Sequence, residues 1–249
     1  MAVIDCHAHV GPVIQDPRLN HAFASNQKGT VEDYLRAMDK AGVDIGVTFG
    51  FLDLNTEYQA EIQRKHSDRI ISLAFVNPRL PNAVSEFRRA VEEWGIRGLK
   101  LHGWWHQFSN ADHVLLDPLC EICAQYGLPI VMHVMADGLT SPLQAEEMAR
   151  TFPNVTFFMS HAGGFWAYSD ALLVAKRTPN IIIDTSAMES WWITHFVQEL
   201  GANRVAMGSD WPWNHLEAIV KTIEISVPRP EDREWVMGKT AAKAFGIPV

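Results

Sequence analysis

Residues 2–11 read AVIDCHAHVG, and this stretch defines the first element of the fold. Its apolar lead-in is typical of a short buried strand. Side chains two apart on a strand lie on the same face, so we expect Asp5, His7 and His9 to project together. By the same alternation, Cys6 points the other way, towards a layer of helices.

The two histidines and the carboxylate of this stretch indicate a metal site. Burying three polar groups together costs free energy unless a partner satisfies them. One solution is a polar strand end whose histidines bond to the backbone. The other is a metal cation, and the i, i+2 spacing of His7 and His9 favours it, because neutral imidazole is a common metal ligand.

Beyond this strand, apolar runs alternate with amphipathic runs along the whole chain. The expected strands are residues 2–9, 42–51, 69–78, 96–103, 128–134, 154–162, 180–186 and 204–210. The expected helices are residues 30–42, 83–95, 116–127, 142–152, 166–177, 190–201, 216–226 and 230–246. Repeated βα alternation predicts an α/β fold with a parallel sheet, and eight units predict a closed (β/α)8 TIM barrel. An open doubly wound sheet is the alternative, but no G-x-G-x-x-G follows the first strand.

Length and composition fit one domain over residues 1–249. The chain is 47% hydrophobic and 20% charged, which is enough for one large core. A net charge of -8 disfavours a nucleic-acid partner. Three cysteines do not suggest a disulfide framework, and neither a signal-like start nor a membrane-length apolar run is present. We expect a cytoplasmic protein with a small-molecule substrate and no membrane partner, as a monomer or a homo-oligomer.

Polar residues recur where the expected strands end. They are Lys100 and His102 in the fourth strand, His133 in the fifth, Ser160 and His161 in the sixth, Asp184 in the seventh, and Ser209 and Asp210 in the eighth. The active sites of TIM barrels lie at the carboxyl ends of the strands. The sequence therefore predicts an active site at this mouth of the barrel.

These residues, together with GLKLHG (98–103), SHAGG (160–164) and GSDWP (208–212), resemble the amidohydrolase superfamily. The chain is most similar to the amidohydrolase-related branch (amidohydrolase 2) that includes aromatic-acid decarboxylases. The resemblance covers nearly the whole chain. It implies a divalent metal held by His7, His9, His133 and Asp210. It also implies that His161 either binds a second metal or hydrogen-bonds the reacting water or the substrate.

The implied ligand set has a clear chemistry. Three imidazoles and a carboxylate suit Zn²⁺, and also Mn²⁺, Fe²⁺ or Co²⁺. Such a metal lowers the pKa of a bound water towards about 7. Asp210 would be both ligand and proton acceptor, and His161 would orient the substrate or move a proton.

Lys100 has two readings in this resemblance. In binuclear members a carboxylated lysine at this place bridges two metals. In mononuclear members a lysine here would bind a carboxylate or phosphate of the substrate. We favour the mononuclear reading.

Tryptophans follow several of the strands and predict the walls of a pocket. Those expected to bind substrate are Trp104, Trp105, Trp166 and Trp211. A broad apolar ring with one donor suits a planar or hydrophobic ligand. The alternative is that these rings pack the barrel rim or an oligomer interface. The long irregular stretch between His9 and Thr30 is a candidate lid, in which Arg18 or Lys28 would contact an anionic substrate. The histidines of the loops, His102 among them, are expected to be solvated.

We therefore expect a metal-dependent hydrolase. In it, a metal-activated water would attack an amide, ester or lactone bond of a small aromatic or hydrophobic substrate. A metal-dependent non-oxidative decarboxylase of an aromatic or heteroaromatic acid is the alternative, because it would use the same ligands. A third reading is a non-catalytic barrel that binds a ligand and retains the metal site.

Overall fold

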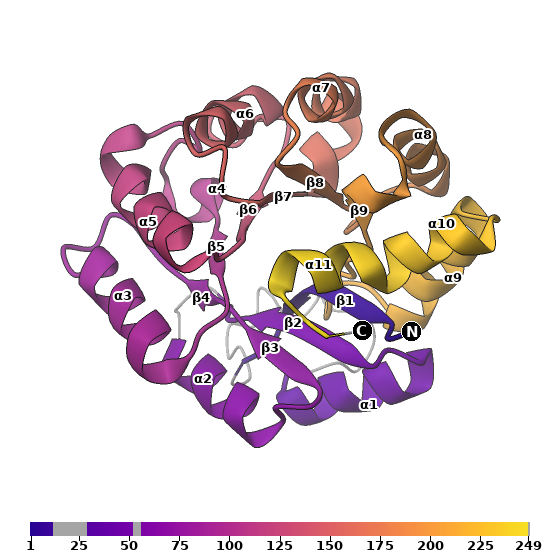
Figure 1. Ribbon diagram of the computed structural model, residues 1–249, viewed down its shortest axis with the longest axis horizontal. Helices are drawn as coiled ribbons and strands as arrows, with labels where there is room; N and C mark the ends of the chain where they lie inside the picture. Colours follow the sequence, from indigo (N-terminus) through magenta and orange to yellow (C-terminus); the bar gives the residue numbers. More distant parts are fainter. Residues whose placement is uncertain (12–28, 52–55, 249) are drawn as a thin grey trace.

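The computed structural model describes residues 1–11, 29–51 and 56–248, and it shows the predicted α/β barrel (Figure 1). The strand segments are β1 Ile4–His9, β2 Ile45–Phe49, β3 Ile70–Ser72, β4 Ala74–Phe75, β5 Leu99–Leu101, β6 Ile130–His133, β7 Phe157–Ser160, β8 Ile181–Asp184 and β9 Val205–Ala206. All paired segments run parallel. Each of the eight predicted strands is present.

Backbone hydrogen bonds join these segments into a closed ring. β3 and β4 are two parts of one strand interrupted at Leu73, whose N–H donates to the Thr48 carbonyl of β2 at 2.8 Å. At the other seam the N–H of Cys6 donates to the carbonyl of Met207, just after β9, at 2.8 Å. The described residues therefore form a barrel of eight parallel strands, which is the architecture expected from the βα repeat.

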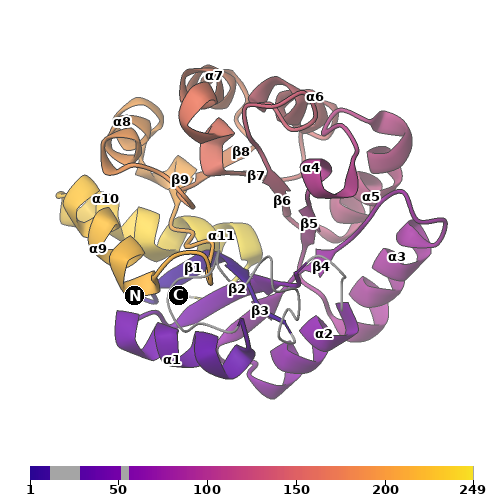
Figure 2. The same ribbon diagram turned by 180° about the vertical axis from the view of Figure 1, so that it is seen from behind.

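Helices surround the ring (Figures 1 and 2). They are α1 Val31–Ala41, α2 Thr56–Lys65, α3 Ala83–Trp94, α4 Gly103–His106, α5 His113–Tyr126, α6 Pro142–Thr151, α7 Gly164–Arg177, α8 Ser190–Leu200, α9 Leu216–Ser226, α10 Pro230–Glu234 and α11 Thr240–Phe245. Short turns η1 His161–Gly163, η2 Ala202–Arg204 and η3 Trp235–Lys239 complete the described elements. None of the described helices is long and apolar enough to cross a membrane.

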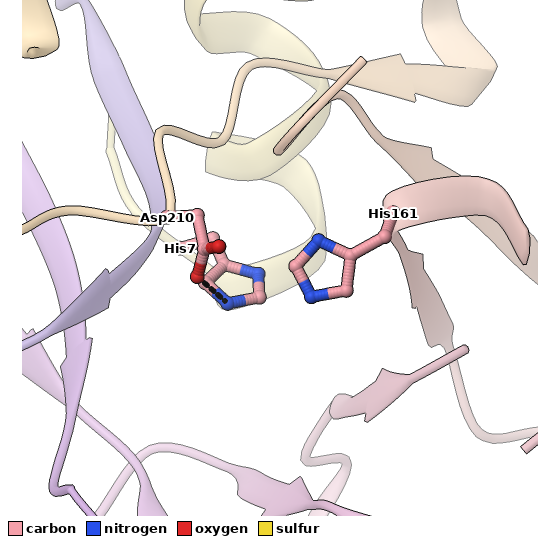
Figure 3. Close-up of side chains that lie close together, drawn as sticks. All are labelled: His7, His161 and Asp210. Atoms are coloured by element: carbon pink, nitrogen blue, oxygen red, sulfur yellow. Dashed lines mark ion pairs between the residues drawn. The ribbon is translucent and has the colours of Figure 1, made fainter. Parts of the chain in front are cut away.

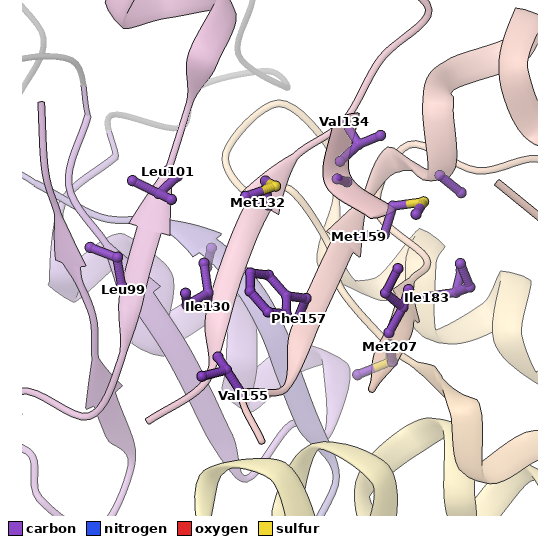
Figure 4. Close-up of a cluster of buried hydrophobic side chains, with 14 of the residues drawn as sticks. Leu99, Leu101, Ile130, Met132, Val134, Val155, Phe157, Met159, Ile183 and Met207 are labelled. Carbon is purple, nitrogen blue, oxygen red and sulfur yellow. The ribbon is translucent and has the colours of Figure 1, made fainter. Parts of the chain in front are cut away.

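Two apolar clusters fill the barrel. The larger lies between strands and helices and takes alternate residues of each strand, such as Leu99 and Leu101 of β5 (Figure 4). The smaller lies inside the ring, and α11 closes its amino-terminal end, where Phe245 stacks on Phe158 with ring centroids 5.1 Å apart. Because apolar side chains close this end, polar side chains can gather only at the carboxyl ends of the strands.

The register of β1 corrects the expectation for Asp5 and Cys6. One extra residue lies in β1 between Asp5 and Ala8, so the alternation of faces changes phase there. The side chain of Asp5 accepts a hydrogen bond from the Tyr34 hydroxyl of α1 at 2.8 Å, on the helical side. Cys6 belongs to the interior cluster. The prediction that Asp5 projects with the two histidines of this strand is therefore wrong.

An ion pair between α6 and α7 gives a stability prediction. The nearly buried carboxylate of Glu146 accepts two hydrogen bonds from Arg177, each 2.6 Å long. These bonds hold the pKa of Glu146 below its ordinary value of 4.5. We expect Glu146→Gln to lower the free energy of unfolding by about 1 kcal/mol at neutral pH, the low end for a charged bond because Arg177 is largely exposed.

The sign of the pH dependence follows from that lowered pKa. The ionised carboxylate stabilises the native state fully above pH 4.5, and this contribution is lost as the pH falls through the lower native pKa. The difference between wild type and Glu146→Gln in urea unfolding should therefore shrink in acid. Glu147→Gln, a change to an exposed neighbour, is the control. A difference that stays constant at all pH values would contradict the role of the ion pair.

Candidate metal centre

Four side chains from three strand ends converge at the mouth of the barrel. His7 and His9 come from β1, His161 follows β7, and Asp210 follows β9. One ligand atom each of His7, His161 and Asp210 lies within 4.8 Å of the others (Figure 3). The Nε2 atoms of His7 and His9 lie 3.3 and 3.6 Å from Oδ1 of Asp210. The fold thus brings together residues more than 200 positions apart in the sequence.

The three imidazoles of this group are held in one tautomer. Their Nδ1 atoms face the Asp184 carboxylate for His7 (2.5 Å), the Gly50 carbonyl for His9 (3.0 Å) and the Ser186 carbonyl for His161 (3.3 Å). Because these oxygens only accept, Nδ1 carries the hydrogen, and a neutral ring of this tautomer has its lone pair on Nε2. Histidines that bind metals are oriented in this way by a second partner.

Asp184 is a functional candidate to which sequence reasoning gave no role. It ends β8 fully buried, and the Ser186 N–H donates to its Oδ1 at 2.9 Å. A Cβ on Gly208 would lie 2.0 Å from the same oxygen, so only glycine lets the chain after β9 pass this close to Asp184. The available signal was the run IIID (181–184), an apolar strand that ends in a carboxylate.

The charges of the group are arranged to receive a cation. Burial alone would raise the pKa of Asp184, but the His7 ring brings it down to about 2. For Asp210, the neighbouring imidazoles of His7 and His161 likewise outweigh burial and hold the pKa well below its usual range. Burial lowers the pKa of His9 far below normal and that of His161 to about 4. Both carboxylates are thus ionised near neutral pH, and these two imidazoles are neutral.

The backbone is strained at two of these residues. His161, Ala162 and Asp210 have φ angles of 62°, 44° and 57°. Non-glycine residues in this left-handed region cost about 1–3 kcal/mol each and persist where the surrounding structure holds them. Such strain concentrates at functional sites, and here it sets the direction of His161 and Asp210.

Lys100 reaches the same group from β5. Its side chain has no exposed surface, and Nζ lies 3.5 Å from Nε2 of His7 and 4.6 Å from the ring centre of Phe49. Burial lowers its pKa to about 8, although Asp184 and Asp210 oppose the shift. A buried ammonium this close to the histidines is placed to meet an anionic group.

His133 is the last residue of β6, and its ring lies beside that of His161. Its centroid lies 4.9 Å from that of His161, and its face stacks on His102 at 3.7 Å. It is not among the three residues whose ligand atoms lie within 4.8 Å of one another. His102 was expected to be solvated, but it is half-buried at the mouth. Lys100 and His102 are two residues apart at the end of one strand, and this spacing indicates that their side chains lie on the same face, at the mouth of the barrel.

The tryptophans divide between the rim and the core. Trp104 and Trp166 are 52% and 86% exposed, and the Trp105 ring lies 6.4 Å from that of His102. Trp211 is fully buried and its ring packs 5.0 Å from that of Tyr34. It has no surface to offer a substrate, so its predicted place in the pocket wall is wrong.

The chain provides a different aromatic wall around His9. Among the described residues, four aromatic rings lie near its imidazole, at centroid distances of 4.6 Å for Phe49, 5.7 Å for Phe51, 6.3 Å for Phe75 and 4.8 Å for Trp213. Phe49 and Phe75 are buried, and the half-buried Trp213 ring is the member with surface to offer a planar ligand. Arg18 and Lys28, the predicted contacts from a lid, lie outside the described residues.

The donor set fits a divalent metal. Imidazole nitrogens with free lone pairs and an ionised carboxylate are the ligands preferred by Zn²⁺ and its first-row neighbours. The Nδ1 contacts of His7, His9 and His161 supply the supporting hydrogen bonds that such ligands need. The geometry alone does not select one metal.

Known proteins resemble this chain in both sequence and structure. A family model described as Amidohydrolase matches residues 4–247. No curated protein matches the sequence. An uncharacterized TIM-barrel protein from Bordetella bronchiseptica is 18% identical, with a TM-score of 0.82 and 99% of each chain covered.

Two further solved structures carry named activities. A dihydroxybenzoic acid decarboxylase from Polaromonas sp. JS666, with bound manganese and the inhibitor 2-nitroresorcinol, is 14% identical. Its TM-score is 0.78, with 99% of this chain and 97% of that chain covered. A probable 2-pyrone-4,6-dicarboxylic acid hydrolase from Acinetobacter baumannii is 17% identical, with a TM-score of 0.71 and 99% and 100% covered. At these identities the likeness shows a shared fold.

Proposed function

Since this chain belongs to the amidohydrolase family, we propose that it is a metal-dependent hydrolase of an amide, ester or lactone bond in a small aromatic or hydrophobic substrate. One observation carries the proposal. The Nε2 atoms of His7 and His9 converge on the ionised carboxylate of Asp210 at the catalytic end of the barrel.

We assign the metal ligands to His7, His9, His133 and Asp210. Zn²⁺ is the first candidate, with Mn²⁺, Fe²⁺ and Co²⁺ as alternatives. A divalent metal supplies a Lewis acid that polarises a substrate oxygen and acidifies a water. We propose one metal per chain, so that Lys100 is free to bind an anionic group of the substrate.

The remaining residues move protons and orient the substrate. Asp210, ionised and at the open end, accepts the proton of the attacking water. His161 has its Nδ1 3.0 Å from Oγ of Ser186, which in turn lies 3.4 Å from Nδ1 of His7. This fixed contact leaves the lone pair on Nε2 of His161 to accept a hydrogen bond from the reacting water.

A decarboxylase is the second candidate, favoured by the aromatic wall around His9. The half-buried Trp213 ring, 4.8 Å from that of His9, suits a planar aromatic acid. Lys100 would hold its carboxylate while the bond to the ring carbon breaks and a proton replaces carbon dioxide. The likeness to a manganese-containing dihydroxybenzoic acid decarboxylase supports this candidate.

Isotope-labelled water separates the two reactions. Aromatic esters, lactones and hydroxybenzoic acids are incubated with the zinc-loaded and manganese-loaded protein in ¹⁸O-water. Hydrolysis places ¹⁸O in the product acid. Carbon dioxide release without label in the aromatic product would overturn hydrolysis in favour of decarboxylation. Full metal occupancy with no turnover of any compound would favour a non-catalytic binding barrel.

The fourth ligand is tested by a matched pair of variants. The family resemblance supports His133, whereas the interatomic distances bring His161 closer. We expect His133→Ala to lose the metal and His161→Ala to keep it while losing turnover by roughly 10²–10⁴-fold. Metal content by elemental mass spectrometry decides between them. If His133→Ala retains the metal and His161→Ala loses it, His161 is the metal ligand and His133 is not.

Asp184 gives a milder effect on the same site. Asp184→Asn keeps an oxygen for the Ser186 N–H but removes the charge that orients His7. We expect metal affinity to fall roughly 10–100-fold, measured by competition with a chelator. Asp117→Asn, on the outer face of α5, is the control. Affinities equal to that of wild type would show that Asp184 does not support the ligand.

The proposal extends to partners and location. We propose a small molecule as the substrate and no nucleic-acid or membrane partner, which the net charge of -8 supports. The exposed Trp166 supports a homo-oligomer. The three cysteines are free, which supports the reducing cytoplasm.

A further inference from the structure

His102 occupies a fixed position at the mouth of the barrel. It follows β5 directly and caps the amino-terminal end of α4, where its Nδ1 accepts a hydrogen bond from the backbone N–H of Trp105 at 3.2 Å. An imidazole nitrogen can accept only through a lone pair. The ring is therefore neutral with its hydrogen on Nε2.

This tautomer is the opposite of that of the neighbouring histidines. In His7, His9 and His161, Nδ1 faces an acceptor and Nε2 has the lone pair. In His102, Nε2 has the hydrogen and has no lone pair to give to a metal. Binding a metal through Nε2 would require His102 to move its hydrogen to Nδ1 and lose the Trp105 bond.

The surroundings of His102 fix its ring and leave its donor available. One face stacks on His133 at 3.7 Å, with 14° between the planes. The Phe75 ring lies 6.2 Å away, and the half-exposed Trp104 ring lies 6.4 Å away. Among the described residues, none accepts a hydrogen bond from Nε2 of His102. A half-buried donor of this kind is available to a ligand.

We propose that the Nε2–H of His102 binds an oxygen of the substrate, beside Lys100 from the same strand. Two donors, one neutral and one cationic, lie two residues apart at the end of β5. This pair suits a carboxylate on a planar ring, and the half-buried Trp213 ring beside His9 would contact the ring itself. The inference rests on the proposed function and narrows its substrate class to carboxylated aromatic compounds.

The first test reads the tautomers directly. Long-range ¹H–¹⁵N NMR of the zinc-loaded protein distinguishes hydrogen on Nε2 from hydrogen on Nδ1 for each histidine ring. We expect the hydrogen on Nε2 in His102 and on Nδ1 in His7, His9 and His161. Titration with benzoate should shift the His102 Nε2–H signal. Hydrogen on Nδ1, or a signal unmoved by benzoate, would overturn the proposal.

Two variants separate the donor from its structural roles. His102→Phe keeps the stack on His133, and His102→Asn keeps an oxygen to cap α4. We expect both to bind benzoate roughly 10- to 100-fold more weakly, because each loses the donor to a charged oxygen. His113→Phe, at an exposed histidine of α5, is the control. Benzoate affinity that survives in either variant would contradict the contact.

Metal content distinguishes failure of this inference from failure of the proposed function. We expect both His102 variants to hold as much zinc as wild type. Zinc lost on His102→Phe and His102→Asn alike would make His102 a ligand and overturn the inference alone. Wild-type protein that binds no metal would overturn the proposed function, while the NMR measurement would still report the tautomer.

Discussion

Asp210→Asn is expected to abolish turnover and metal binding while leaving the barrel folded. The carboxylate lies 3.3 Å from Nε2 of His7 and 3.6 Å from Nε2 of His9, and it is the one anionic ligand we propose. Its loss also removes the proposed proton acceptor, which alone contributes roughly 10²–10⁴-fold to the rate. Asparagine has the same shape and tolerates the left-handed φ of 57° at this position.

Two measurements check this result. Elemental mass spectrometry gives metal per chain, and circular dichroism with urea unfolding shows that the variant is folded. The milder variant Asp184→Asn is the comparison, because it keeps all proposed ligands and loses only a supporting charge. A folded Asp210→Asn protein with wild-type metal content and rate would remove Asp210 from the site and, with it, the proposed mechanism.

The strands were predictable because each is a short apolar run between amphipathic stretches. This pattern is local, and it also places polar residues such as His161 and Asp210 at one end of the barrel. Helix α2 was missed because it has few apolar residues and buries a polar one, Gln59, whose side chain bonds to Thr48 at 3.0 Å. This hydrogen bond satisfies the buried amide of Gln59, and the sequence pattern does not reveal the partner.

The errors in the site have a different physical origin. The bulge in β1 adds one residue and turns Asp5 to the helices, a change that alternation alone cannot show. Trp211 and Trp213 are two apart in a loop, yet one packs inside on Tyr34 and the other meets His9. Such assignments depend on contacts across the fold, and the pairing of Asp184 with His7 over 177 positions is of the same kind.

Lys100→Met is expected to change stability and function in opposite directions. The ammonium group is fully buried, and burial has already lowered its pKa to about 8, which shows that the charged form is disfavoured there. Methionine is an unbranched apolar side chain that fills a similar space. We expect the free energy of unfolding to rise by about 1–3 kcal/mol. A bound divalent metal would increase the gain, because it repels the lysine charge.

The same change should weaken binding of an anionic substrate. Loss of the cationic donor should lower the affinity for benzoate roughly tenfold or more, while one metal per chain remains. Urea unfolding, benzoate titration and elemental analysis are compared with Lys65→Met, an exposed control in the last turn of α2. Two metals in wild type and fewer in Lys100→Met would instead make Lys100 a carboxylated bridge. That outcome would replace the mononuclear site with a binuclear one, because a lysine engaged between two metals cannot bind the substrate.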